Sequence, residues 1–167
     1  MSAGTRPPLL QLGGQEAFAA YEKEFSRLYQ NRRLYDVLGN QVVFEASSCW
    51  HVCFEPQEKD QYSRRKRTLW SQERAEHIPW IMDALNDLGT EVRPNDKDPI
   101  NRLNYLIVIE ADPANNLPQE YYIVVTERIN RTTVRFTTAY PIDVYAWRAY
   151  RKTGLALYPM KKKKDKQ

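Results

Sequence analysis

Hydrophobic positions along the chain recur at different periods, and each period predicts a different element. Between Gln15 and Leu38 they recur every three or four residues, which is typical of a helix with one buried face. Gly39 is expected to end this helix, and 41–46 reads as a short strand. The next segment, 47–56, fits either a strand or a short helix, and its type stays open.

A second helix is predicted from Ser71, as its N-cap, to Leu88, with Pro79 as the site of a kink. Its apolar stripe begins with an arginine and consists of Arg74, Ile78, Ile81, Leu85 and Leu88. An arginine on the stripe that faces the core either extends past the rim to water or meets an anion or a carboxylate. Arg74 is therefore a candidate for an internal anion-binding group.

Three long strands follow, at 101–111, 120–129 and 132–140, joined closely enough for an antiparallel meander. A closing helix is predicted over 143–150. The chain is thus expected to form helices before and after an antiparallel sheet.

The last strand has an unusual pattern of side chains. At the two-residue period of a strand, one face carries Val134, Phe136, Thr138 and Tyr140, and the other carries Thr133, Arg135, Thr137 and Ala139. The first face begins apolar and ends polar. This predicts that the strand leaves the core with Thr138 and Tyr140 at the rim, where a cleft can form, although ordinary strand packing explains the same residues.

Length and charge place these elements in one domain. The 167 residues suit a single domain at 15–158, preceded by a mobile leader at 1–14 and followed by a disordered basic tail at 159–167. The formal net charge is +4, but the tail alone carries five lysines and one aspartate, so 1–160 is formally neutral.

An internal basic run remains as a candidate for binding phosphates. Its arginines are Arg64, Arg65 and Arg67, and Arg135 on the last strand is a further candidate. A solvated loop or a localisation signal explains the same run.

Other features indicate the compartment. No stretch approaches the roughly 20 apolar residues of a membrane span, and no basic and then apolar secretory leader is present. Cys49 and Cys53, the only cysteines, are spaced poorly for a disulfide. A cytoplasmic location is expected, or delivery into the cytoplasm of a target cell.

The sequence lacks the motifs of several common kinds of active site. The sequence contains neither a glycine-flanked serine elbow nor a phosphate-binding glycine loop. Zinc usually takes four ligands, and the chain offers four in Cys49, His51, Cys53 and His77. Their spacing, however, matches no usual zinc module. No metal and no cofactor are therefore predicted, and a metal-dependent protein is kept as the third alternative.

A metal-free constellation remains, formed by His51, Arg74, Thr138 and Tyr140. RNA cleavage by its own 2′-hydroxyl requires a proton acceptor, a proton donor and groups that bind the phosphate. Histidine can serve as acid or base, arginine offers two fixed donors to phosphate oxygens, and hydroxyl groups can orient the phosphate. The sequence therefore favours a metal-independent endoribonuclease.

Three motifs carry a resemblance to a known family. They are Cys49-Trp-His-Val-Cys-Phe-Glu, Trp70-Ser-Gln-Glu-Arg-Ala-Glu-His-Ile-Pro-Trp-Ile81 and Phe136-Thr-Thr-Ala-Tyr-Pro141. In this order they resemble the phage-associated branch of the barnase–EndoU–colicin–RelE-like nucleases, over roughly 41–150. Trp70, Pro79 and the inserted basic run depart from that pattern.

The resemblance implies a barnase/EndoU-like α+β fold, with N-terminal helices packed on a curved antiparallel sheet of about four strands. It also implies RNA cleavage that leaves a cyclic phosphate. It implies His51 as acid or base, Arg74 as phosphate clamp, and Thr138 with Tyr140 as a hydroxyl pair. The other proton-transfer group is left unassigned, with Tyr140 or a group of the substrate as the candidates. A toxin or effector role, RNA such as tRNA as substrate, and an immunity or antitoxin protein as partner are further implications. The alternative is a non-catalytic RNA-binding module that uses the basic run at 64–67 and the abundant aromatic residues.

Overall fold

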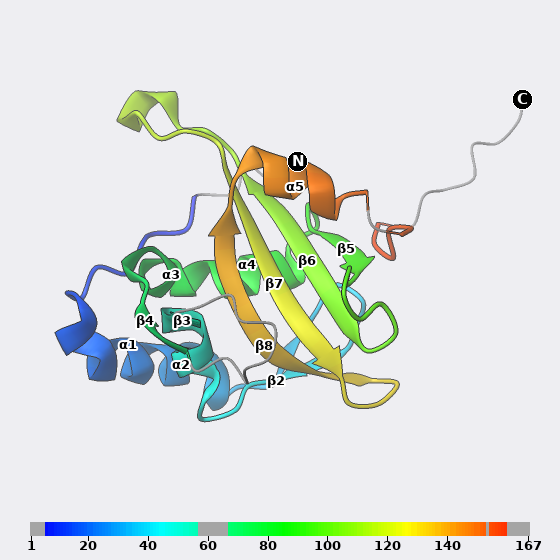
Figure 1. The fold of residues 1–167 in the computed structure, drawn as a ribbon, viewed down its shortest axis with the longest axis horizontal. Coiled ribbons are helices and arrows are strands. Elements are labelled where there is room, and N and C mark those ends of the chain that lie inside the picture. Colours follow the sequence, from blue (N-terminus) through cyan, green and yellow to red (C-terminus); the bar gives the residue numbers. More distant parts are fainter. Residues whose placement is uncertain (1–5, 57–66, 153, 160–167) are drawn as a thin grey trace, which may run out of the picture.

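The computed structural model describes residues 6–56, 67–152 and 154–159. Its architecture is α+β, with an N-terminal helix beside a curled, mixed sheet of six strands that forms half a barrel (Figure 1). The predicted α+β class is confirmed. The prediction of about four antiparallel strands is wrong in strand number, and it is wrong for one pairing.

The six strands lie in the order β1-β2-β8-β7-β6-β5. Their bounds are β1 Leu34–Tyr35, β2 Gln41–Val43, β5 Glu91–Pro94, β6 Arg102–Ile109, β7 Glu120–Arg128 and β8 Thr133–Ile142. The predicted meander is confirmed for β6, β7 and β8, and β5 extends it by one antiparallel strand that was not predicted. The exception is β2, which pairs with β8 in parallel.

The expected N-terminal helix ends earlier than predicted. It consists of a 3-10 turn η1 (Gln15–Ala17), the helix α1 (Phe18–Phe25) and a π-helical turn η2 (Ser26–Gln30). Tyr21, Phe25 and Tyr29 form its buried face. Gly39 lies instead in the turn between β1 and β2, where its φ of 86° suits a residue without a Cβ.

The segment whose type stayed open contains both elements. Helix α2 (Ser48–Cys53) leads directly into strand β3 (Phe54–Pro56), which pairs with β4 (Arg67–Trp70) in a separate two-stranded sheet. The basic run at 64–66, between these strands, is outside the described residues.

The predicted second helix divides at its proline. It consists of α3 (Gln72–Glu76), the 3-10 turn η3 (Ile78–Trp80) and α4 (Ile81–Asn86). Ser71 is the N-cap of α3, because its hydroxyl accepts a hydrogen bond from the Arg74 backbone N–H. Leu88 is 84% exposed, beyond the end of α4, so it does not belong to the buried stripe.

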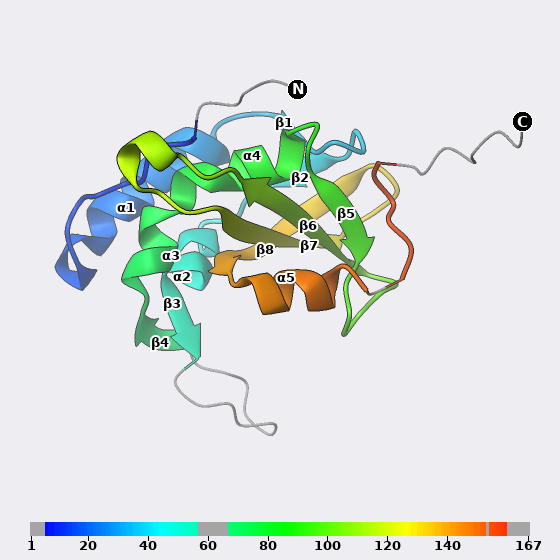
Figure 2. The same cartoon turned by 90° about the horizontal axis from the view of Figure 1, so that it is seen from above.

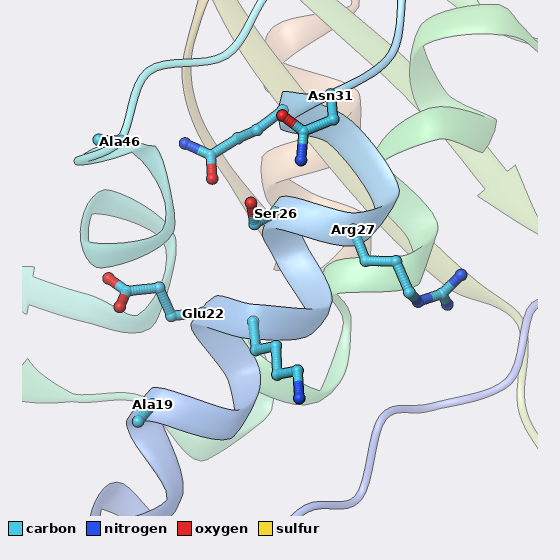
Figure 3. A pocket seen from close by; sticks show the side chains of 8 residues that line it. Ala19, Glu22, Ser26, Arg27, Asn31 and Ala46 are labelled. Atoms are coloured by element: carbon cyan, nitrogen blue, oxygen red, sulfur yellow. The ribbon is translucent and has the colours of Figure 1, made fainter.

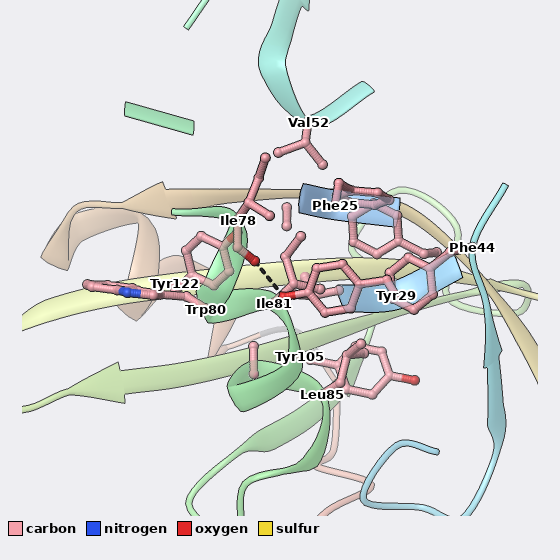
Figure 4. Close-up of a cluster of buried hydrophobic side chains, with 14 of the residues drawn as sticks. Phe25, Tyr29, Phe44, Val52, Ile78, Trp80, Ile81, Leu85, Tyr105 and Tyr122 are labelled. Atoms are coloured by element: carbon pink, nitrogen blue, oxygen red, sulfur yellow. Dashed lines mark hydrogen bonds between the residues drawn. The ribbon is translucent and has the colours of Figure 1, made fainter. Parts of the chain in front are cut away.

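Two apolar clusters lie on opposite faces of the sheet. The larger one fills the concave face and includes Phe25, Tyr29, Ile81 and Tyr105 (Figure 4). The smaller one lies on the other face, under the closing helix α5 (Val144–Tyr150), and contains the buried Trp147. Helices α4 and α5 therefore cover opposite faces (Figure 2).

A β-bulge in β8 corrects the predicted face of two candidate residues. Val125 on β7 is opposite Thr138, whereas the next residue, Thr126, is opposite Phe136, which leaves Thr137 as an extra residue. The alternation reverses at this point. Phe136 faces the concave core, while Thr138 and Tyr140 share the other face, on which Tyr140 packs with the smaller cluster.

Part of the expected leader lies along the domain. The Arg6 guanidinium donates to the carbonyl oxygens of Glu110 and Pro118 and pairs with the Glu120 carboxylate. The Trp80 indole donates to the Pro7 carbonyl at 3.0 Å. Residues 6 and 7 therefore join this segment to the end of the β6–β7 hairpin and to η3.

Candidate functional site

The candidate residues meet along one edge of β8. Strand β2 pairs only with 133–135, and no other described strand pairs with 136–142 on that side. Helices α2 and α3 pack against β8 in place of a strand, and the β3–β4 hairpin lies next to them (Figure 1). Side chains from four elements can therefore converge at this edge.

Arg74 lies at the centre of this convergence. Its side chain is only 12% exposed, and its Nε donates to Glu55 Oε1 at 3.0 Å. Its guanidinium carbon lies 4.5 Å from the centroid of the Tyr140 ring, within the range of a cation–π contact. Of the two outcomes expected for Arg74, the structure therefore shows the meeting with a carboxylate.

One donor atom of Arg74 is unused. The Nη1 atom is buried and has no hydrogen-bond partner within the described part of the chain. An unsatisfied buried donor of a charged group is costly, and it is uncommon in folded proteins. A phosphate oxygen at Nη1 would satisfy it with a charge-assisted hydrogen bond.

Thr138 joins β8 to the helix that carries His51. The Thr138 hydroxyl donates to the backbone carbonyl of His51 at 3.1 Å. His51 lies in the last turn of α2, and its side chain is exposed. The bulge at Thr137 is what turns Thr138 towards this contact, so the position of α2 depends on the local backbone of β8.

Tyr140 is held from the opposite side by helix α5. Its hydroxyl lies 3.0 Å from the hydroxyl of Tyr150. Burial of Tyr150, followed by this hydrogen bond, raises the pKa of its phenol, so Tyr150 stays protonated near neutral pH. The ring of Tyr140 is thereby fixed between α5 and the Arg74 guanidinium.

The other predicted phosphate-binding residues are not part of this cluster. Arg135 pairs with Glu45 at 3.0 Å and with Glu127 at 3.2 Å, and hydrogen bonds to these carboxylates raise the pKa of its guanidinium. It lies five residues before Tyr140, or about 17 Å along the strand. Arg64 and Arg65 are outside the described residues, as is the side chain of Arg67.

Sequence reasoning missed two members of the cluster, Glu55 and Tyr150. Glu55 is 40% exposed, and it projects from β3 only four residues after His51. The short spacing between a histidine and a carboxylate ahead of a basic run was an available signal. Tyr150 had no such signal, because its contact with Tyr140 depends on how α5 folds back over the sheet.

The cysteines occupy a different side of α2. A strand would have aligned Cys49, His51 and Cys53 on one face, but this segment is a helix. The helix places the two cysteines on its buried face and leaves His51 exposed. Their sulfur atoms are 3.9 Å apart, and the hydrogen bond between them together with burial raises the pKa of the Cys49 thiol. In the described ranges no three His, Cys, Asp or Glu residues converge as ligands.

The surface formed by the described residues includes two hollows. The larger, of about 620 Å³, follows α1 and η2 and is lined by Glu22, Ser26 and Arg27 among others (Figure 3). The smaller, of about 460 Å³, lies between α3, the start of β7 and the start of α5. Only the smaller one adjoins the cluster, because its lining residues Glu73 and Pro141 are the sequence neighbours of Arg74 and Tyr140.

Comparison of the chain with known protein families, with curated proteins and with solved structures found no match. Among the described residues, none of the helices has the length and apolar character needed to cross a membrane.

Proposed function

We propose that this protein is a metal-independent endoribonuclease whose active site lies at the edge of β8. The observation that carries the proposal is Arg74, a nearly buried cation that contacts Tyr140 and Glu55 and has an unused donor at Nη1. Such a group is preorganised to bind a phosphate and to stabilise charge that develops on it. The resemblance to the barnase–EndoU–colicin–RelE-like nucleases, found in the sequence motifs, supports the same reading.

The reaction needs two proton transfers. A base removes the proton of the 2′-hydroxyl, whose oxygen attacks phosphorus as the bond to the 5′-oxygen breaks, and an acid protonates the departing 5′-oxygen. His51 and Glu55 supply these two roles in our proposal, because Glu55 fills the position that the sequence left unassigned. The products are a 2′,3′-cyclic phosphate and a 5′-hydroxyl end.

The remaining residues position these groups. Thr138 holds the helix of His51 by its backbone carbonyl, and Tyr140 fixes the plane of the Arg74 guanidinium. Glu55 pairs with Arg74 at Nε, so the buried Nη1 is left to donate to a phosphate oxygen while Glu55 stays at the site in its proton-transfer role.

The test is cleavage of total RNA and of labelled tRNA in the presence of a chelator. Wild type should give discrete fragments ending in cyclic phosphate, and Arg74→Ala should lower the rate by about a hundredfold or more, as loss of a charge-stabilising group does. His51→Ala and Glu55→Gln should also lose cleavage. Thr138→Ala should lose activity while Thr138→Ser retains it, since serine keeps the hydroxyl that donates to His51.

Arg27→Ala is the matched control, because Arg27 is exposed and lies on η2, away from this edge. Undiminished cleavage in His51→Ala, Arg74→Ala and Thr138→Ala, with circular dichroism showing folded protein, would refute the site. Cleavage that requires an added divalent metal would refute the mechanism.

A non-catalytic RNA-binding module is the second candidate. It is favoured by the position of the basic run, which joins β3 to β4 in the hairpin that also carries Glu55. This candidate predicts salt-sensitive RNA binding that is weakened by neutralising Arg64, Arg65 and Arg67 and survives His51→Ala. RNA binding that is unchanged when those three arginines are neutralised would exclude the RNA-binding module.

A further inference from the structure

Four aromatic side chains meet beside the candidate site, each from a different element. They are Phe18 on α1, Trp50 on α2, Phe54 on β3 and Trp70 on β4, and these elements lie together in Figure 1. Each ring contacts at least two of the others, with centroids 3.8 to 6.4 Å apart. Only Trp50 of these four is exposed, at 41%. The aromatic cluster therefore presents one indole ring at the surface.

The plane of this indole is fixed by its neighbours. The ring of Trp50 stacks on Phe54, with centroids 3.8 Å apart and planes at 18°. The ring of Phe18 is 5.4 Å from both members of this stack and stands at 85° to Trp50. A ring that is equally distant from both members of a stack lies beside the stack and not on its outer face. Phe54 thus covers one face of the indole, Phe18 lies along its side, and neither covers the second face.

The indole lies close to the proposed catalytic groups but on another side of β3. Trp50 precedes His51 on α2, and Phe54 precedes Glu55 on β3. Successive residues of a strand point to opposite sides, so the ring of Phe54 and the carboxylate of Glu55 are on opposite sides of β3. Arg74 pairs with Glu55 at 3.0 Å. A ligand that contacts both Arg74 and the indole must therefore extend past this strand, as a chain of several nucleotides can.

We propose that the indole of Trp50 is a stacking platform for a base of single-stranded RNA, on a nucleotide that flanks the one whose phosphate lies on Arg74. The inference rests on the proposed function and names the substrate class of the same site. Every nucleobase has a flat π face, so stacking on tryptophan tolerates any sequence. The stack of Trp50 on Phe54 exists before RNA binds, so little side-chain freedom is lost on binding.

The platform selects unpaired RNA. In a duplex the faces of each base are covered by the neighbouring base pairs, whereas the bases of loops and free ends can be splayed out onto an aromatic side chain. The wild-type protein should therefore bind a single strand at least about tenfold more tightly than a duplex of the same sequence, the scale of one base–aromatic stack. This comparison requires no variant, so it does not depend on whether a substituted protein folds.

The experiment measures binding of a short, labelled single-stranded RNA to the full chain by fluorescence anisotropy. Every 2′-hydroxyl of this RNA is methylated, so it cannot be cleaved by attack of that group. Trp50→Leu keeps an apolar side chain against Phe54 but removes the π face, and it should raise Kd about tenfold. Trp50→Phe keeps a ring and should stay within about threefold of wild type. Tyr145→Leu is the matched control, because Tyr145 is a 75% exposed aromatic residue on α5, and it should leave Kd unchanged.

Equal affinity of wild type and Trp50→Leu, with circular dichroism showing folded protein, would overturn the inference. Equal binding of single strand and duplex, or no binding of either, would also overturn it. In the cleavage assay Trp50→Leu should raise KM and leave kcat unchanged, because a flanking base is bound equally before and during the reaction. Cleavage that does not depend on Trp50 leaves the nuclease and removes the platform. Binding that depends on Trp50, without cleavage, leaves the platform and removes the catalysis.

Discussion

Individual buried polar residues fall into two groups. In one group every polar side-chain atom has a hydrogen-bond partner, and in the other at least one such atom has none. Asp36 is buried, yet its two oxygens accept hydrogen bonds from the Tyr105 hydroxyl, the Asn40 side chain and two backbone N–H groups. Such a residue needs no ligand to explain it. Arg74 Nη1 is buried without a partner among the described residues, and it belongs to a cation that contacts Tyr140 and Glu55 at the edge of β8, which is why it carries the proposed function.

The buried state of His77 predicts a pH dependence of stability. Burial is the main cause that lowers its pKa below the ordinary 6.5, so the unfolded chain binds more protons between the two values. The stability contributed by neutral His77 is therefore complete above about pH 6.5 and is lost as the pH falls towards the folded pKa. Each unit of pKa difference contributes about 1.4 kcal/mol.

The measurement is urea unfolding of wild type and of His77→Phe between pH 7.5 and pH 5. Phenylalanine can occupy the position between Trp80 and Tyr122 but cannot take up a proton. The variant should lose less stability over this range than wild type. The slopes are compared rather than absolute stabilities, because the slope reports only protons bound. Parallel slopes would contradict the prediction.

Among the elements, β8 contributes most to the candidate site. One extra residue in this strand determines which face of the sheet the side chains of its C-terminal half occupy. Val134 and Phe136 pack into the concave core, and after Thr137 the chain presents Thr138 and Tyr140 to the opposite face. A regular strand would have placed all four on one side. Because of the bulge, a single strand contributes side chains both to the concave core and to the candidate site.

Deletion of Thr137 tests this role. Without the extra residue, pairing with β7 can be kept on only one side of the bulge, so either Phe136 or Tyr140 must leave its cluster. We expect a loss of more than about 3 kcal/mol in the free energy of unfolding, the scale of removing a large core side chain. Urea unfolding measures this loss. Thr137→Ala, which keeps the residue count, should cost no more than about 1 kcal/mol; a deletion variant as stable as wild type would show that the bulge has no such role.

At the scale of the whole molecule, distant segments close around the curled sheet. The N-terminal residues 6–12 join η3 and the β6–β7 hairpin through Arg6 and Pro7, and the Leu10 backbone N–H donates to the Glu76 carbonyl at 2.8 Å. At the other end, Tyr158 forms a β-bridge with Val92 on β5. The N-terminal segment therefore holds α3 and η3, and the C-terminal segment holds the edge strand β5.

Removal of 1–12 should destabilise the domain although it leaves every sheet strand intact. We expect a loss of roughly 2–4 kcal/mol from the hydrogen bonds to Trp80 and Glu76 and from the contact of Arg6 with the Trp80 ring. Urea unfolding measures it. Leu9→Ala, a substitution at a largely solvent-facing position in the same segment, should stay within about 0.5 kcal/mol, and an unchanged truncated protein would contradict the prediction.

The sequence by itself determined the features that depend on local pattern. The periodicity identified the long strands β6, β7 and β8, the closing helix α5, the Ser71 cap and the break at Pro79. It also put Arg74 on the buried stripe, since helical spacing fixes which residues share a face. These are properties of neighbouring residues, and the chain carries them before it folds.

Tertiary structure alone decided the rest. The short strands β1, β3, β4 and β5 contain two to four residues, too few for a period, and they exist because a partner supplies their hydrogen bonds. Registry with β7 introduced the bulge at Thr137, which set the direction of Thr138 and Tyr140. The pairing of Arg74 with Glu55, and of Tyr140 with Tyr150, joins residues 10 to 19 positions apart. Such contacts form only when the chain folds back on itself, so no local pattern specifies them.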